Sequence, residues 1–237
     1  MRLKISKMTI FSIFSIALFC SAILFGVYSA KNANVTSNGL IEYKYDFTKD
    51  YQQVEYIKTT GTQYINMGIK PTNNTKVYID FMYTSVSGFL YGSRQSVSST
   101  DMHACIYETG HIIYPQFGSS QGKISDVINI LNVRSTLYNS QDGAVLNSST
   151  IKTYNTMSFT SNYNMYLGAL NQAGSVESRT FKGQIYACKV WEGSNIVRDF
   201  VPCYRISDNV IGLYDLVSET FYVNAGTGTF AKGADVK

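Results

Sequence analysis

The stretch that decides the fold reads VYIDFMY and runs from Val77 to Tyr83. Successive side chains of an extended strand point to opposite faces, so this alternation places every second residue on one side. The residues on the predicted core face are Val77, Ile79, Phe81 and Tyr83. The opposite face carries Tyr78, Asp80 and Met82. Because Asp80 is charged, we expect it to meet solvent or a neighbouring strand.

Short β-prone runs of the same kind recur along the rest of the chain. Turn-forming pairs such as Thr60-Gly61 and Thr109-Gly110 separate them. The other predicted strands are residues 54–57, 63–67, 89–91, 102–107, 111–117, 163–170, 181–191, 196–203, 210–215 and 220–223. Because about a dozen short strands recur without a long helical pattern, the sequence predicts one all-β, antiparallel sandwich.

The segment from Ile124 to Tyr138 permits two interpretations. In its first half the apolar residues are spaced as on one face of a helix. Asn129, Asn132 and the β-branched residues weaken a helix, so a strand is predicted here instead. This strand is expected to end at a hairpin turn formed by residues 139–143 (NSQDG).

The N-terminus has the pattern of an export signal. Arg2, Lys4 and Lys7 precede a run from Met8 to Tyr28 that carries no charge. This run predicts an apolar helix that is either a signal peptide cleaved near Ala30 or a retained membrane anchor. Both alternatives place the rest of the chain outside the cell or on its surface, with the membrane touched only through this segment.

The predicted domain organisation follows from this leader. Residues 1–30 are the signal peptide or anchor, residues 31–50 are a polar tether or an entering strand, and residues 51–237 form the sandwich domain.

The composition supports a folded domain and excludes one class of partner. Hydrophobic residues make up 45% of the 237 residues, which is ample for a core, and aromatic residues make up 14%, which favours strands. The formal net charge of +4 includes the three cations of the leader, so the remainder is nearly neutral. Nucleic-acid binding needs a clustered basic face, so nucleic acid is not an expected partner.

The cysteines do not form a simple disulfide set. Cys20 lies in the apolar segment, and the exported part contains Cys105, Cys188 and Cys203, an odd number. Their wide spacing differs from that of a zinc site, so buried, free thiols with a structural role are predicted. A disulfide between Cys188 and Cys203 is the alternative.

Three segments resemble a known family. Residues 51–57 (YQQVEYI) followed by residues 60–65 (TGTQYI) are similar to the opening of laminin-G-like, concanavalin A-like jelly-roll domains. These domains occur in surface and phage-associated proteins of Gram-positive gut bacteria. Residues 164–169 (NMYLGA) resemble a late strand of this family, and residues 181–191 (FKGQIYACKVW) resemble its closing strand.

The resemblance implies details of that closing strand. Its inward residues would be Phe181, Ile185, Cys188 and Val190, with a bulge that breaks the simple alternation. The segments 197–205, 212–215 and 221–222 resemble the tail of the bacterial subgroup. The resemblance covers about residues 51–230 and is specific for the fold and the bacterial subgroup. It is not specific for function, because the same fold occurs in lectins, adhesins and glucanases.

The sequence contains no recognised catalytic motif. A glucanase needs two carboxyl groups about 5 to 9 Å apart, and its relatives carry them in a Glu-x-Asp-x-x-Glu run that is missing here. Asp101, Glu108 and Glu177 remain as acids that could form an unrecognised pair. His103 and His111 could also face each other across a hairpin and bind a metal.

Carbohydrate recognition needs exposed aromatic faces beside planar polar groups. Residues 89–117 are the richest in such groups. The candidate ligand-binding residues are Tyr91, Arg94, His103, Tyr107, Tyr114 and Gln116. No cofactor is required by this prediction, but Ca²⁺ could be held by loop aspartates, as in lectin-like relatives. The candidate calcium ligands are Asp101, Asp142 and Asp208.

The leading hypothesis is an exported, non-enzymatic binding module that recognises a glycan or a surface protein. Two alternatives remain: a glycoside hydrolase of the concanavalin A-like glucanase type, and a structural or phage-derived surface protein.

Overall fold

A computed structural model describes residues 31–35, 41–119 and 127–237. The predicted N-terminal helix in residues 1–30 lies outside the described residues. No helix within the described ranges is both long and apolar enough to span a membrane. The described chain divides into a small N-terminal hairpin and a compact unit that spans residues 48–237.

The hairpin occupies the segment for which a tether or an entering strand is predicted. It consists of β1 (Lys31–Val35) and β2 (Ile41–Tyr45), which pair antiparallel from Lys31 opposite Tyr45 to Val35 opposite Ile41. A short 3-10 helix, η1 (Phe47–Lys49), follows. The segment therefore folds on itself into two strands, a pairing that its polar composition does not reveal.

The compact unit contains two sheets. The first sheet consists of β3 (Tyr51–Gln53), β4 (Ile57–Thr59), β6 (Thr75–Tyr83), β10 (Arg134–Ser140), β11 (Gly143–Leu146), β12 (Ser149–Lys152), β16 (Gly183–Glu192), β17 (Asn195–Arg205), β18 (Ile211–Asp215), β19 (Thr220–Val223) and β20 (Ala231–Lys232). The second sheet consists of β5 (Ile65–Asn66), β7 (Gly88–Arg94), β8 (Met102–Glu108), β9 (Ile112–Gly118), β13 (Tyr166–Leu167), β14 (Asn171–Gln172) and β15 (Ser175–Val176).

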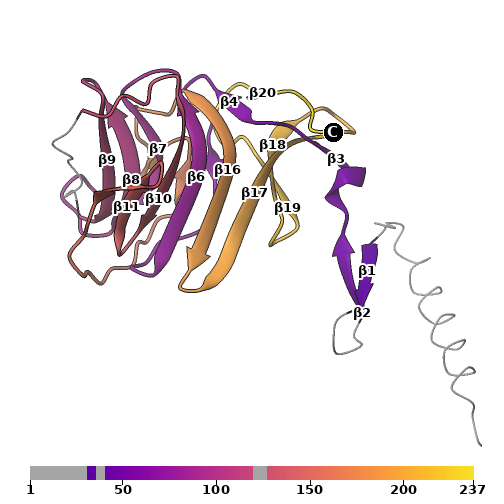
Figure 1. The fold of residues 1–237 in the computed structure, drawn as a ribbon, viewed down its shortest axis with the longest axis horizontal. Coiled ribbons are helices and arrows are strands. Elements are labelled where there is room, and N and C mark those ends of the chain that lie inside the picture. Colours follow the sequence, from indigo (N-terminus) through magenta and orange to yellow (C-terminus); the bar gives the residue numbers. More distant parts are fainter. Residues whose placement is uncertain (1–30, 36–40, 120–126) are drawn as a thin grey trace, which may run out of the picture. The chain divides into compact units, whose positions relative to one another are not determined.

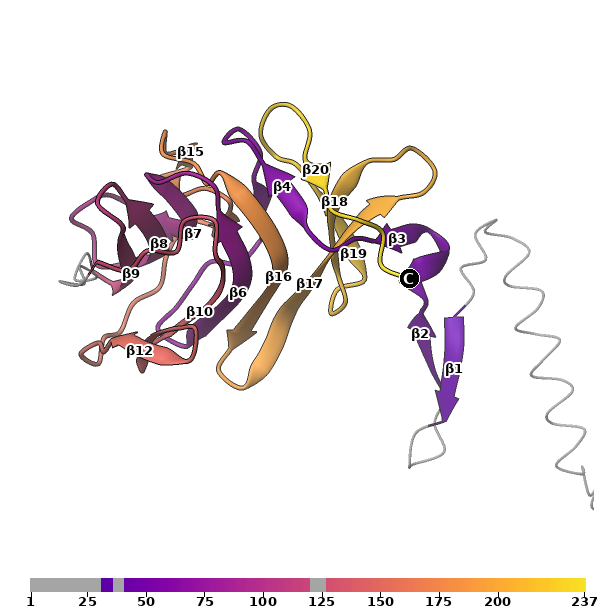
Figure 2. The same ribbon diagram turned by 45° about the horizontal axis from the view of Figure 1, so that its top comes forward.

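The two sheets pack as the layers of a sandwich. In the first sheet the order is β12-β11-β10-β6-β16-β17-β18-β19, and β3, β4 and β20 join at its side. Figures 1 and 2 show β7, β8 and β9 as a layer beside β6, β10 and β16. All pairings between the described strands except that of β14 with β7 are antiparallel, so the predicted all-β, antiparallel sandwich is confirmed.

The alternation in residues 77–83 is confirmed as the core pattern of the first sheet. β6 alternates strictly between buried and half-buried residues. Its inward side chains, from Val77 to Tyr83, are 0% exposed and contribute to one core with residues of the second sheet. The buried Tyr83 hydroxyl donates to the Gly88 carbonyl oxygen at 2.8 Å, so this polar group is not left unpaired.

The predicted bulge in the closing strand is also present. The register of β16 against β6 shifts between Ile185 and Ala187. This shift lets the inward set resume after Tyr186. The four predicted inward residues are buried: Phe181, Ile185, Cys188 and Val190.

The ambiguous segment is a strand only in its last part. β10 begins at Arg134, and the predicted hairpin is present, since β10 and β11 pair from Ser140 opposite Gly143. Residues 127–133 form no strand but pack apolar side chains onto the core, where Ile130 is buried. The prediction of a strand over the whole segment is therefore wrong for residues 127–133. Their apolar side chains reach the core from irregular backbone and not from a strand.

The three cysteines of the sandwich are free and buried, as predicted, and the alternative disulfide is not formed. Burial raises the pKa of the Cys203 thiol to about 12. Burial also raises the pKa of Cys105 and Cys188 well above their usual value. These thiols therefore act as small apolar side chains.

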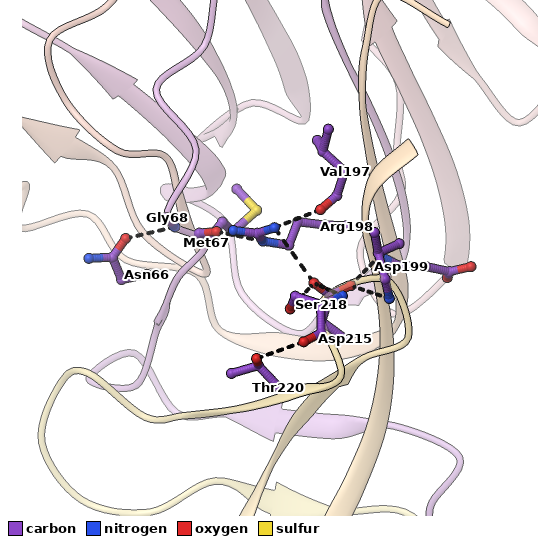
Figure 3. Close-up of polar contacts among 10 residues, drawn as sticks. Asn66, Met67, Gly68, Val197, Arg198, Asp199, Asp215, Ser218 and Thr220 are labelled. Atoms are coloured by element: carbon purple, nitrogen blue, oxygen red, sulfur yellow. Dashed lines mark hydrogen bonds and ion pairs between the residues drawn. The ribbon is translucent and has the colours of Figure 1, made fainter. Parts of the chain in front are cut away.

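A largely buried ion pair joins β17 and β18 of the first sheet, and its arginine also contacts the chain next to β5 of the second sheet (Figure 3). The Arg198 guanidinium lies 3.6 Å from the carboxylate of Asp215, which is fully buried. Arg198 Nε also donates to the carbonyl oxygen of Met67, next to β5, at 2.9 Å. Asp215 accepts from the backbone of Asp199 and from the Ser218 hydroxyl, at 2.8 and 2.6 Å. Because both charges have several partners, neither is left uncompensated in the interior.

Candidate functional site

The candidate ligand-binding residues from the sequence lie mostly in the core of the second sheet. Tyr91, His103 and Tyr107 are 0% exposed. Arg94 and Gln116 are also buried, and Tyr114 is half-buried against a small apolar cluster. The exposed aromatic faces expected at residues 89–117 are therefore not present, and buried rings have no face to offer to a ligand.

Both faces of this part of the second sheet are covered. The inner face packs on the first sheet, and all residues of β7 are buried. On the outer face, Leu170 joins Phe89, Ala104 and Ile106 in a second apolar cluster. The guanidinium groups of Arg94 and Arg179 lie 5.5 and 5.2 Å from the centre of the Phe89 ring. The residue pattern of one predicted strand does not show whether other segments will cover one or both of its faces.

The acids considered for hydrolysis are held by a shared cation. Arg179 forms ion pairs with Glu108 at 2.8 Å and with Glu177 at 2.9 Å. Asp101 is at the start of β8 and accepts from the Gln95 amide and the Ser161 hydroxyl. The two glutamates thus meet in space, but through an arginine that forms an ion pair with each of them.

The metal candidates do not come together. Asp101, Asp142 and Asp208 lie in three different loops, and Asp208 forms an ion pair with Arg205 at 2.7 Å. In the part of the chain that the structure describes, no three His, Cys, Asp or Glu side chains are grouped to hold a metal ion. His103 and His111 contact different tyrosines, Tyr91 and Tyr107, so they do not form the bridging pair considered from the sequence.

The outer face of the first sheet carries the half-buried aromatic side chains that the second sheet lacks. We call this set the aromatic face: Tyr56, Tyr78, Tyr138, Tyr186 and Trp191. Trp191 is the only tryptophan of the chain. Its ring lies 6.4 Å from that of Tyr138 in an edge-on arrangement, and the rings of Tyr56 and Tyr186 are 5.4 Å apart.

The strand register explains why these rings gather. Tyr138 of β10 lies opposite Tyr78 of β6, which lies opposite Lys189 of β16. Because neighbours in register share a face, an aromatic row crosses the centre of the sheet. Lys189 in turn forms an ion pair at 2.9 Å with Asp199 of β17. Polar groups therefore continue the row where the rings end.

Charged groups order the other half of the aromatic face. The Arg134 guanidinium lies 3.9 Å from the centre of the Tyr186 ring and donates two hydrogen bonds to Asp80, at 2.9 and 2.8 Å. The hydrogen bond to Asp80 is the main cause that raises the pKa of Arg134. Asp80 thus meets both solvent and a neighbouring strand, as predicted. The guanidinium therefore holds the Tyr186 ring in place on this face.

A polar hollow adjoins the aromatic face at the end of these strands. We call it the rim pocket, with a volume of about 230 Å³. Its lining residues are Asn73, Asn74, Lys76, Gln141, Asp142 and Gly193. They come from the loop before β6, the start of β6 itself, the β10–β11 turn and the β16–β17 turn. Since Lys76 lies opposite Trp191 in the sheet, the rim pocket is next to the indole.

The loop of residues 72–76, which we call the pocket loop, is held in place by Glu192. The Glu192 carboxylate accepts from the hydroxyl groups of Thr72 and Thr75, the latter at 2.7 Å. The Gly193 amide donates to the Asn74 carbonyl oxygen at 3.0 Å. These bonds fix the backbone on which the side-chain amides of the rim pocket are displayed.

Two larger hollows flank the loop of residues 224–228. One, of about 430 Å³, includes Asp208, Asn209 and Phe230, and the other, of about 420 Å³, includes Tyr64 and Glu177. The Tyr64 ring lies 4.7 Å from that of Tyr166, tilted by 31°. The first hollow is lined mostly by apolar side chains and glycine beside Asp208, Asn209 and Asn224, and the second largely by glycine, alanine and threonine. Each therefore offers fewer planar polar groups than the rim pocket.

Sequence reasoning missed the aromatic face, although a signal was present. In the deciding stretch, Tyr78 lies on the outward side of a strand whose inward side was identified correctly. In the closing strand, Trp191 follows the inward Val190 and is therefore outward. The outward aromatics of each strand could thus be listed from the sequence, but their proximity on one face depends on the strand pairing.

Comparisons with known proteins support the fold. No protein-family model and no curated protein matches this chain. A solved protein from Bacteroides ovatus, designated a proposed carbohydrate-binding protein, has a TM-score of 0.52 at 11% identity, and the match covers 85% of this chain. The chain spans 66% of that protein's length.

The heptameric SAP-like pentraxin of Limulus polyphemus is also similar, with a TM-score of 0.46 at 12% identity. That match covers 78% of this chain and 95% of the pentraxin. At identities this low the Bacteroides similarity shows the fold alone, a jelly-roll sandwich of the lectin-like type.

Proposed function

We propose that this chain is a non-enzymatic carbohydrate-binding module and that its ligand lies on the aromatic face, with one end in the rim pocket. The observation that carries the proposal is the position of Trp191, which lies beside Tyr138 and opposite Lys76 of the pocket. This places an apolar ring next to amide and charged groups on one surface.

The chemistry of the site suits a sugar. The C–H faces of a pyranose ring pack on the faces of aromatic side chains, and its hydroxyl groups need donors and acceptors nearby. Asn73, Asn74 and Gln141 supply both kinds of group. Lys76 donates only, and the Asp142 carboxylate accepts only. Such a set satisfies a neutral polyhydroxyl ligand better than an apolar one, which would leave these groups unpaired.

We also propose that the domain acts outside the cell, on a glycan or a surface protein. The basic and then apolar N-terminal sequence supports this location. Detection of the sandwich domain on intact cells or in the medium, by surface labelling, would test it, and a pool confined to the cytoplasm would contradict it.

The binding test uses the chain's single tryptophan as its own probe. Titration with a panel of soluble glycans, including β-glucans, is expected to change the Trp191 fluorescence for at least one of them. Trp191→Ala and Tyr138→Ala should each weaken binding of that glycan, measured by calorimetry, by about twofold to tenfold, because an aromatic contact is worth about 0.5 to 1.5 kcal/mol.

The matched control is Tyr166→Ala, which removes a half-buried ring of the same kind from the second sheet. It should leave binding unchanged. Loss of binding in this control, with full binding in Trp191→Ala, would contradict the proposed site. Release of reducing ends from a bound β-glucan would contradict the non-enzymatic assignment and favour the hydrolase.

Calcium is not expected to be required. Two of the three candidate aspartates are engaged, Asp101 by Gln95 and Ser161 and Asp208 by Arg205. Binding of the identified glycan should therefore persist after treatment with a chelator. A chelator-sensitive affinity that returns with Ca²⁺ would instead assign Asp142 and its pocket neighbours to an ion.

A further inference from the structure

His103 lies directly beneath the rim pocket and contacts the pocket loop. Its side chain is 0% exposed in β8, and its Nε2 atom is 3.2 Å from the Thr75 carbonyl oxygen. Thr75 stands between Asn74 and Lys76, which both line the pocket. The imidazole thus joins the second sheet to the backbone of the proposed site.

Thr75 is the junction of the pocket loop. Its amide donates to the Thr72 carbonyl oxygen at 3.1 Å, and its hydroxyl accepts from the Thr72 amide at 2.8 Å. The same hydroxyl donates to Glu192 at 2.7 Å. His103 adds a contact at the carbonyl oxygen, so a displacement of His103 is passed to both pocket residues beside Thr75.

A chain of hydrogen bonds assigns the proton of the imidazole. The Asn139 amide nitrogen donates to the Tyr91 hydroxyl at 2.8 Å, and this hydroxyl lies 3.0 Å from His103 Nδ1. Since the Tyr91 oxygen already accepts one bond, its own proton points to Nδ1. The proton of the neutral ring is therefore on Nε2, from which it donates to Thr75.

The surroundings of the ring disfavour a positive charge. The Phe117 ring packs edge-on at 5.0 Å, and Tyr91 is the titratable group in contact with the imidazole. Tyr154 reaches the ring only through Asn139, and Glu192 only through Thr75. Among the described residues, no carboxylate is in contact with the imidazole. Burial lowers the pKa of His103 to about 4, against a smaller opposing effect of the Thr75 carbonyl.

We propose that neutral His103 is a positioning residue for the pocket loop, and that protonation of its Nδ1 breaks the hydrogen bond from Tyr91, displaces the ring, shifts this loop through the retained bond to the Thr75 carbonyl oxygen and weakens ligand binding at the rim pocket. Protonated Nδ1 would turn Tyr91 from donor into acceptor, although its oxygen already accepts from Asn139. A buried cation with an unpaired donor is unfavourable, so the ring is displaced and moves the Thr75 backbone with it. The effect on ligand binding rests on the proposed function, whereas the response of the loop needs no ligand.

The test follows the protein by nuclear magnetic resonance, without ligand, from about pH 7 to pH 3, a range that spans the titration of a lowered histidine. The amide signals of Asn74 and Lys76 are expected to shift with the same midpoint as the His103 ring, near pH 4. Core amides such as that of Ile79 should stay in place. Failure of the two loop amides to follow the ring would overturn the proposal, as would simultaneous loss of the core signals, which indicates global unfolding.

Two variants separate positioning from a general effect. His103→Gln keeps a donor for Thr75 but does not titrate, so the loop amides should hold their positions at every pH. His111→Gln replaces the only other histidine and should behave as the wild type. Identical loop shifts in His103→Gln and the wild type would overturn the proposal.

Tyr91→Phe provides a second route if His103→Gln does not fold. It removes the hydroxyl that stabilises the unprotonated Nδ1, so the ring and the loop amides should both titrate at a higher pH than in the wild type. A raised midpoint for the ring with an unmoved loop would show that the two are not coupled. Because no glycan is present, these results do not depend on whether a sugar binds.

Discussion

The two sheets of the sandwich use their outer faces differently. In the first sheet β6 buries Val77 and Ile79 inside and leaves Tyr78 and Asp80 half-buried outside. In the second sheet every residue of β7 is buried, since the segment around Leu170 covers its outer face. Aromatic side chains are therefore available to a ligand only where one face stays uncovered, and their number along a strand does not report this.

The largest effect is expected from the covered outer face. Phe89→Ala removes a ring that is 1% exposed and lies under two guanidinium groups. The substitution leaves a cavity that neighbouring side chains fill only in part. The free energy of unfolding should therefore fall by about 3 to 5 kcal/mol. Denaturant unfolding measures this loss.

The comparison variant is Tyr138→Ala on the uncovered face of the first sheet, which should cost less than about half as much because that ring is half-buried. Equal losses in the two variants would show that the two faces are not different.

A smaller effect is expected from acid, and it also belongs to the second sheet. The pKa of His103 is lowered by burial from 6.5 to about 4. Between these pH values the unfolded chain therefore binds a proton at this residue and the folded chain does not. This stabilisation is complete above about pH 6.5 and is lost as the pH falls towards 4, with a total of about 3 kcal/mol. Unfolding free energies measured between these pH values should follow that slope.

His103→Gln should flatten the slope, and His111→Gln should keep it. If the wild type is equally stable at pH 6.5 and near pH 4 while His103 titrates, the described burial of the ring is wrong.

The smallest effect is expected from the ion pair on the aromatic face. Arg134 is 59% exposed and pairs with Asp80 at 2.8 Å. Exposed pairs contribute about 0.2 to 1 kcal/mol, so a double-mutant cycle of Arg134→Ala and Asp80→Asn should give a coupling in this range. The coupling should decrease with added salt. A coupling above about 2 kcal/mol would mean that this face is covered, as in the second sheet.

The parts of the fold that follow period two could be predicted from the sequence. Residues 77–83 alternate because one of their faces meets the core, and the pattern of Phe181 and Ile185 on the closing strand followed the family resemblance. The free state of the cysteines followed from their odd number in the exported part and from their apolar context. These cysteines are Cys105, Cys188 and Cys203. These features depend on local alternation or composition.

The candidate site could not be predicted in the same way. Met102–Glu108 contains aromatic and polar residues, but Leu170, far along the chain, buries one of its faces. Tyr78, Tyr138 and Trp191 become neighbours only through the pairing of β10, β6 and β16. Residues 127–133 were predicted as strand because spacing alone does not distinguish irregular packing from regular structure. The covered face of β8 and the aromatic face thus depend on contacts between segments far apart in the sequence.

The most direct test of the proposed site is a map of amide shifts on addition of a glycan selected by the fluorescence panel. We expect the shifted residues to cluster on the outward positions of β6, β10 and β16 and in the rim pocket, with Trp191 and Lys76 among the most affected. A cluster around Tyr64 and Tyr166 on the second sheet, with Trp191 unmoved, would contradict the account.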